Sequence, residues 1–126
     1  MLSTKRVLLI DDEDDIREVA AMSLEAVAGW ETVAAPSGRE GIRIAREQKP
    51  DAILLDVMMP DLDGPSTFQL LREDPLTNSI PVVFLTAKAQ AVEQRVLREL
   101  GANGVIAKPF DPMALAGQIS GLLGWN

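Results

Sequence analysis

The chain has 126 residues, an apolar content of 47% and a net charge of −7, which suit one compact domain with a sizeable core. This acidic balance argues against a nucleic-acid surface, because phosphate backbones attract clustered Lys and Arg. Cys and His are both absent, which excludes disulfides and thiolate metal sites and removes the commonest general base. Any bound metal is therefore expected to be a hard ion that prefers oxygen ligands.

The amino-terminal segment does not have the pattern of a signal peptide or a membrane span. Its apolar run extends only from Val7 to Ile10 before acidic residues begin. A signal-peptide core is longer, and a membrane span needs about 18 apolar residues. We therefore expect a cytoplasmic protein with no membrane insertion.

Apolar patterning along the chain predicts five strands that alternate with five helices. Short, β-prone runs predict strands at 7–10, 30–35, 52–55, 82–85 and 105–107, of which 30–35 alternates loosely and is expected at an edge. Helical spacing and capping signals predict helices at 16–27, from Ser37 to Lys49–Pro50, at 64–72, at 89–100, and from Asp111 as N-cap with Pro112 following. Strict alternation requires crossover connections, so the fold class is α/β with a doubly wound parallel sheet.

Polar residues follow four of these five strands directly. Asp11 and Asp12 follow the first, Asp56 the third, Thr86 the fourth and Lys108 the fifth. Any one of them alone is more simply an ordinary turn residue. Ligands of open α/β sheets, however, bind at the carboxyl ends of the strands, so together these residues predict a site. Three adjacent carboxylates repel by about 4 kcal/mol per pair at 4 Å, which Mg²⁺ and a lysine ammonium would relieve.

Four sequence fragments resemble the receiver domains of two-component response regulators, and the resemblance spans essentially the whole chain. The fragments are Leu9-Ile10-Asp11-Asp12-Glu13, Leu55-Asp56-Val57-Met58-Met59-Pro60 with Gly64 beyond it, Leu85-Thr86-Ala87, and Lys108-Pro109-Phe110. The resemblance implies a five-stranded, flavodoxin-like (βα)5 receiver fold. It also implies a phosphoacceptor signalling switch that modifies only itself rather than an enzyme acting on external substrates.

By the same resemblance, Asp56 is the phosphoacceptor and Mg²⁺ is the cofactor. The implied metal ligands are Asp12, Asp56 and the backbone carbonyl of Met58, with Asp11 acting through a metal-bound water. The implied phosphoryl-binding and switch groups are the Thr86 hydroxyl, the Ala87 backbone and the Lys108 ammonium. The Lys108–Pro109 bond is expected to be cis.

The family resemblance also implies partners. The phosphoryl donor would be a phosphohistidine on a sensor histidine kinase or histidine phosphotransfer protein, and the output a protein target that docks on the face of helix four, strand five and helix five. Many receivers carry an aromatic ring three residues before the lysine, where this chain has Val105, so the usual aromatic switch is not expected. Because the chain ends at Asn126, we expect one receiver domain over residues 1–126 with no attached effector.

Other site classes fit the residues less well. A calcium-binding EF-hand loop starting at Asp11 would need Gly where Ile16 stands and Glu where Met22 stands. An aspartate-nucleophile phosphatase would need an acid where Met58 stands, and a nucleotide- or flavin-binding module would need a glycine-rich loop after the first strand. The rivals that stay open are an Mg²⁺-dependent phosphate hydrolase and a passive interaction module, separated by turnover of a phosphate ester and by failure of Asp56 to be phosphorylated.

Overall fold

The computed structural model describes residues 4–88 and 90–125 as five strands and five helices in strict alternation. The strands are β1 (Arg6–Ile10), β2 (Glu31–Ala35), β3 (Ala52–Asp56), β4 (Val82–Thr86) and β5 (Gly104–Ala107). The helices are α1 (Asp14–Ala28), α2 (Gly38–Gln48), α3 (Gly64–Glu73), α4 (Ala91–Glu99) and α5 (Leu115–Leu123).

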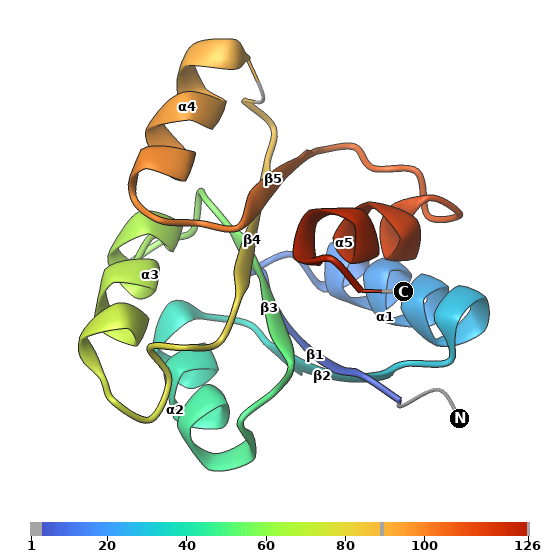
Figure 1. Ribbon diagram of the computed structural model, residues 1–126, viewed down its shortest axis with the longest axis horizontal. Helices are drawn as coiled ribbons and strands as arrows, with labels where there is room; N and C mark the ends of the chain where they lie inside the picture. The colour runs from blue at the N-terminus through green and yellow to red at the C-terminus, as the bar shows by residue number, and fades with distance from the viewer. Residues whose placement is uncertain (1–3, 89, 126) are drawn as a thin grey trace.

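All five strands form one parallel sheet in the order β2-β1-β3-β4-β5. Figure 1 shows α1 and α5 on one face of this sheet and α2, α3 and α4 on the other. The doubly wound, flavodoxin-like prediction is therefore confirmed. The central strands β3 and β4 are buried at every position, whereas the edge strand β2 is partly exposed, as its looser alternation predicted.

The alternation of side chains along each strand divides the apolar core in two. Leu8, Ile53 and Phe84 belong to the cluster beneath α2, α3 and α4, whereas the neighbouring Leu9 and Leu54 belong to the cluster beneath α1 and α5. Both faces of the sheet are therefore covered. The carboxyl ends of the strands are left as the edge where polar side chains can meet.

Side-chain caps begin α2 and α3, and one predicted helix start is wrong. The Ser37 side chain accepts a hydrogen bond from the Glu40 N–H at the start of α2, as predicted. Helix α5 begins at Leu115 rather than directly after Asp111, because residues 112–114 first form a turn. Asp111 caps this turn: its carboxylate accepts from the Met113 N–H at 2.9 Å and its carbonyl accepts from the Leu115 N–H at 3.0 Å. For α4, whose first described residue is Ala91, the predicted start at Ala89 lies outside the described residues.

The termini of the described chain meet at the amino ends of the strands. The rings of Trp30 and Trp125 lie edge to face with centroids 5.3 Å apart, and the Lys5 ammonium lies 4.9 Å from the Trp125 ring centroid. Within the described residues, none of the helices combines the length and apolarity that crossing a bilayer requires.

Candidate functional site

Strand register brings the first and third strands' acidic residues together. Ile10 pairs with Leu55 across β1 and β3, so Asp11 at the end of β1 comes level with Asp56 at the end of β3. Strand order reverses between these strands, since β2 lies on one side of β1 and β3 on the other. The acids thus meet at the point of an α/β sheet where ligands bind.

Three carboxylates converge at this edge. One oxygen from each of Asp11, Asp12 and Asp56 lies within 4.8 Å of the others. Asp11 and Asp56 are buried, whereas Asp12 is exposed to solvent. Oxygen donors at this spacing, open on one side to water, fit Mg²⁺, which retains several waters and takes few protein ligands.

The Lys108 ammonium joins this cluster from the loop after β5. Its Nζ lies 2.8 Å from Asp11 Oδ2, 3.1 Å from Asp56 Oδ1 and 3.6 Å from Glu13 Oε1. The Lys108 N–H donates to the Thr86 carbonyl at 2.8 Å, which extends the pairing of β4 with β5 and fixes the start of the side chain. The following Lys108–Pro109 bond is cis, as predicted.

Proton affinities at the site follow from burial and from these charges. Burial, together with the Asp11 carboxylate, raises the pKa of Asp56 from 3.8 to about 6, although Lys108 acts in the opposite direction. Burial lowers the pKa of Lys108, but hydrogen bonds to Asp11 and Asp56 outweigh it, so that this pKa is raised above 10.5. Lys108 therefore stays charged at neutral pH, and Asp56 is mostly charged.

The remaining predicted site residues lie in the loops after β3 and β4. The Thr86 hydroxyl is buried and faces its own loop, accepting from the Lys88 N–H at 2.9 Å and donating to the Lys88 carbonyl at 3.4 Å. Ala87 is exposed between them. Met58 follows β3 with an exposed side chain, and Val105 lies half-buried in β5 opposite Phe84.

Gly64 packs closely against the acceptor strand. Its N–H donates to the Val57 carbonyl at 2.8 Å, and an added Cβ would lie 2.3 Å from the Asp56 carbonyl oxygen and 2.7 Å from Val57 Cα. Only a residue without a side chain fits there. The glycine therefore lets α3 begin directly beside Asp56.

Sequence reasoning did not identify Arg17, which the structure connects to the site. Its Nη1 donates to the Asp11 carbonyl at 2.6 Å, and its Nη2 pairs with the Asp14 carboxylate. One signal in the sequence was a cation near the start of a helix, where the macrodipole disfavours positive charge.

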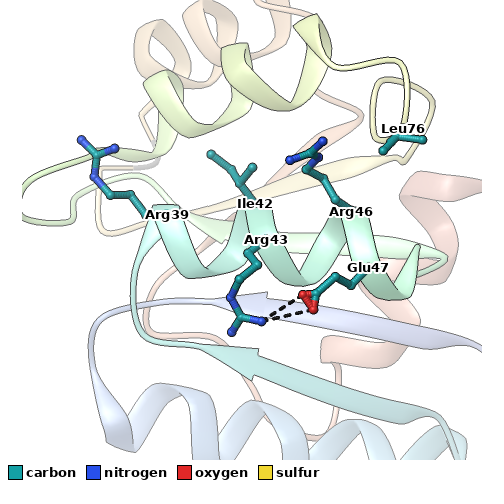
Figure 2. Close-up of a pocket in the computed structure, with 6 residues that line it drawn as sticks. All are labelled: Arg39, Ile42, Arg43, Arg46, Glu47 and Leu76. Carbon is teal, nitrogen blue, oxygen red and sulfur yellow. Dashed lines mark hydrogen bonds and ion pairs between the residues drawn. The ribbon is translucent and has the colours of Figure 1, made fainter.

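A hollow of about 520 Å³ on α2 was the other candidate for an anion site (Figure 2). Arginines line it, but each is paired with an acid: Arg39 with Asp61 at 3.2 Å, Arg43 with Glu47 at 3.0 Å and Arg46 with Asp74 at 2.8 Å. These pairs neutralise the arginines, so that the hollow has no free cationic group to hold an anion.

Comparison with known proteins agrees with the geometry. The model of the response regulator receiver domain matches residues 7–120. The chain belongs to this family. It is 38% identical over 119 residues to the phosphate regulon transcriptional regulatory protein PhoB of Pseudomonas aeruginosa, covering 94% of this chain and 52% of that protein. It is 37% identical over 122 residues to the probable transcriptional regulator ycf27 of Cyanophora paradoxa, covering 97% and 49%. The receiver therefore spans about half the length of these curated relatives.

Solved structures resemble this receiver over nearly its whole length. The chemotaxis response regulator CheY4 of Vibrio cholerae superposes with a TM-score of 0.88 at 28% identity, covering 95% of this chain and 99% of that one. The N-terminal domain of a response regulator receiver protein from Methanoculleus marisnigri gives 0.79 at 32% identity, covering 98% and 100%. The predicted family is confirmed, and with it a role in two-component signal transduction.

Proposed function

We propose that this receiver is a phosphorylation switch in which Asp56 accepts a phosphoryl group from a phosphohistidine. The donor would be a sensor histidine kinase or a histidine phosphotransfer protein, partners that suit the receiver family. The observation that carries the proposal is the convergence of Asp11, Asp12, Asp56 and Lys108 at one sheet edge.

In this reaction an Asp56 carboxylate oxygen forms a bond to phosphorus while the phosphorus–nitrogen bond of the donor breaks. The electron pair of that bond returns to the imidazole nitrogen, so the donor leaves as histidine. Phosphoryl transfer depends on in-line positioning and on neutralising the oxygens. Lys108 already contacts Asp56, and its ammonium can bind a phosphoryl oxygen as the transfer proceeds.

The metal fits the acidic cluster by donor type and spacing. Asp12, Asp56 and the Met58 backbone carbonyl would hold Mg²⁺ directly, and Asp11 would hold it through a metal-bound water. When bound, Mg²⁺ would neutralise charge on the carboxylates and on the incoming phosphoryl oxygens.

The Thr86 hydroxyl would then bind a second phosphoryl oxygen, and the Ala87 N–H would donate to the same group. For this the hydroxyl must leave the Lys88 backbone, where it now accepts and donates. That exchange would move the loop after β4 and the start of α4. We propose the face formed by α4, β5 with Val105, and α5 as the surface that docks a downstream protein.

The experiment is phosphorylation by a small phosphodonor such as acetyl phosphate with Mg²⁺, followed by intact mass measurement. We expect one acid-stable, base-labile phosphoryl group, as for an acyl phosphate, and none in Asp56→Asn. Asp61→Asn is the matched control, because Asp61 is exposed and has a positive φ of 71° that asparagine tolerates. Undiminished labelling of Asp56→Asn would disprove the proposal.

A further inference from the structure

Arg17 is a charged residue whose side chain is largely withdrawn from solvent. Its side chain is 17% exposed, whereas that of its ion-pair partner Asp14 is 86% exposed. The two guanidinium nitrogens divide between partners, since Nη1 donates to the Asp11 carbonyl at 2.6 Å and Nη2 pairs with Asp14. The buried part of this interaction is therefore the contact with the backbone of Asp11.

The macrodipole of α1 does not favour this placement. Arg17 is the fourth residue of α1, near the end where the macrodipole is positive and favours the acids Asp14 and Asp15. A cation there is unfavourable unless a specific contact compensates. The hydrogen bond to the Asp11 carbonyl is such a contact, because bonds from charged donors are about twice as strong as neutral ones.

The Asp11 carbonyl oxygen lies in the peptide plane that links Asp11 to Asp12. That plane is rigid, so holding its oxygen against α1 holds the whole peptide, with the Cα atoms of both acids, in one orientation relative to that helix. Asp11 lies beyond the last residue of β1, where the strand ladder no longer orients the carbonyl. Arg17 thus provides orientation at the one peptide that carries both acids.

We propose that Arg17 is a positioning residue for the metal site, acting through the Asp11–Asp12 peptide. The inference rests on the proposed function, because it requires that these carboxylates bind Mg²⁺. In this role the planar guanidinium orients the peptide between Asp11 and Asp12, and the peptide orients the two carboxylate side chains. A lysine has the charge but lacks the fork.

Positioning and simple charge make opposite predictions for Mg²⁺ affinity. If Arg17 only added positive charge near the carboxylates, removing it would tighten Mg²⁺ binding. If it orients the carboxylates, removing it weakens binding, and replacement by Lys does not restore it. Groups that orient metal ligands typically change affinity by 10- to 100-fold when they are removed.

The test is calorimetric titration of the full chain with Mg²⁺, in wild type, Arg17→Met and Arg17→Lys. We expect both variants to bind about tenfold more weakly. Two controls should stay within about twofold of wild type: Asp14→Asn, which removes only the exposed ion pair, and Arg43→Met, which removes an exposed arginine paired with Glu47.

Phosphorylation kinetics separate positioning from a general loss of structure. Both Arg17 variants should need more Mg²⁺ for half-maximal labelling of Asp56, yet approach the wild-type rate at saturating Mg²⁺. Unchanged or tighter Mg²⁺ binding in Arg17→Met, or full restoration by Arg17→Lys, would overturn the inference while leaving the proposed function intact. If wild type itself neither binds Mg²⁺ nor takes label, the proposed function fails, and the inference with it.

Discussion

The Nζ of Lys108 lies 3.1 Å from Oδ1 of Asp56, and the Asp56 carboxylate is the group proposed to accept the phosphoryl group. The same nitrogen lies 2.8 Å from Asp11, so one ammonium neutralises part of the charge of two buried carboxylates. Burial, together with the negative charge of Asp11, nevertheless raises the pKa of Asp56 to about 6. Three carboxylates meet one ammonium here, so the metal-free site carries excess negative charge.

Asp12→Ala is expected to weaken Mg²⁺ binding by at least about tenfold, because it removes a direct carboxylate ligand. In metal-free buffer the same change should raise the free energy of unfolding by less than about 1 kcal/mol, because Asp12 is exposed and its repulsion is screened. Calorimetric titration and denaturant unfolding measure the two effects. The control is Asp15→Ala, an exposed acid on α1. An unchanged Mg²⁺ affinity would exclude Asp12 as a ligand.

Asp56→Asn should stabilise the metal-free protein in a pH-dependent way. The pKa of Asp56 is about 6 when folded against 3.8 in its ordinary state, so its protonated form favours folding, and this contribution is lost as pH rises through 6. The variant and wild type should therefore be equally stable below pH 3.8, where Asp56 is protonated in both the folded and the unfolded state. By pH 7 the variant should gain at most about 3 kcal/mol.

The measurement is denaturant unfolding with a chelator present, at several pH values. Asp61→Asn serves as the control, since its side chain is 75% exposed in wild type and should give no such trend. A difference between Asp56→Asn and wild type that does not change with pH would contradict the assignment of this titration to Asp56.

Gly64→Ala should lower the free energy of unfolding by about 1–3 kcal/mol, because its Cβ would meet the backbone of Asp56 and Val57 at 2.3 and 2.7 Å. Gly117→Ala is the matched control: an added Cβ meets nothing within 4 Å on α5, so stability should rise by about 0.5–1 kcal/mol. Thermal or denaturant unfolding measures both. Equal effects of the two substitutions would show that the close approach of Gly64 is not a constraint.

Phosphorylation should alter the α4–β5–α5 face through the backbone from Thr86 to Val92. The added charge of about −1.5 to −2 provides new acceptors for the Thr86 hydroxyl, which must leave Lys88 to reach them. With Val105 in place of an aromatic ring, we expect a backbone shift rather than a large rotamer change. Amide chemical shifts with and without a phosphoryl mimic plus Mg²⁺ are the measurement. Perturbations confined to the metal and acceptor residues, with Val105 and α5 silent, would argue against this output.

The sequence predicted the sheet well because buried parallel strands have a simple signature. Runs such as Val82–Leu85 are apolar throughout, which requires cover on both faces. The start of α5 was predicted too early because Asp111 caps a turn over residues 112–114 that precedes the regular helix. An acid before Pro has the same local pattern whether the capped turn continues directly as helix or not.

For the site, strand-end positions predicted which residues gather but not how their side chains are shared. The Lys108 ammonium contacts both Asp11 and Asp56, and this shared contact depends on strand register and on the rotamer of the lysine side chain. The Thr86 hydroxyl bonds its own loop, a local alternative that residue identity does not reveal. Arg17 was missed because its partner is a backbone carbonyl, which any residue type provides.

The edge-to-face pair of Trp30 and Trp125 lies far from the acidic cluster, which matters for fluorescence measurements. They are the only tryptophans in the chain, and both lie at the amino ends of the strands, whereas the acidic cluster lies at the carboxyl ends. We expect emission from the two indoles to report global unfolding of the protein, and we expect cation binding at the acidic edge to leave the surroundings of the indoles unaltered. Folding can therefore be monitored by fluorescence at any Mg²⁺ concentration without a signal from ligand binding superimposed on it.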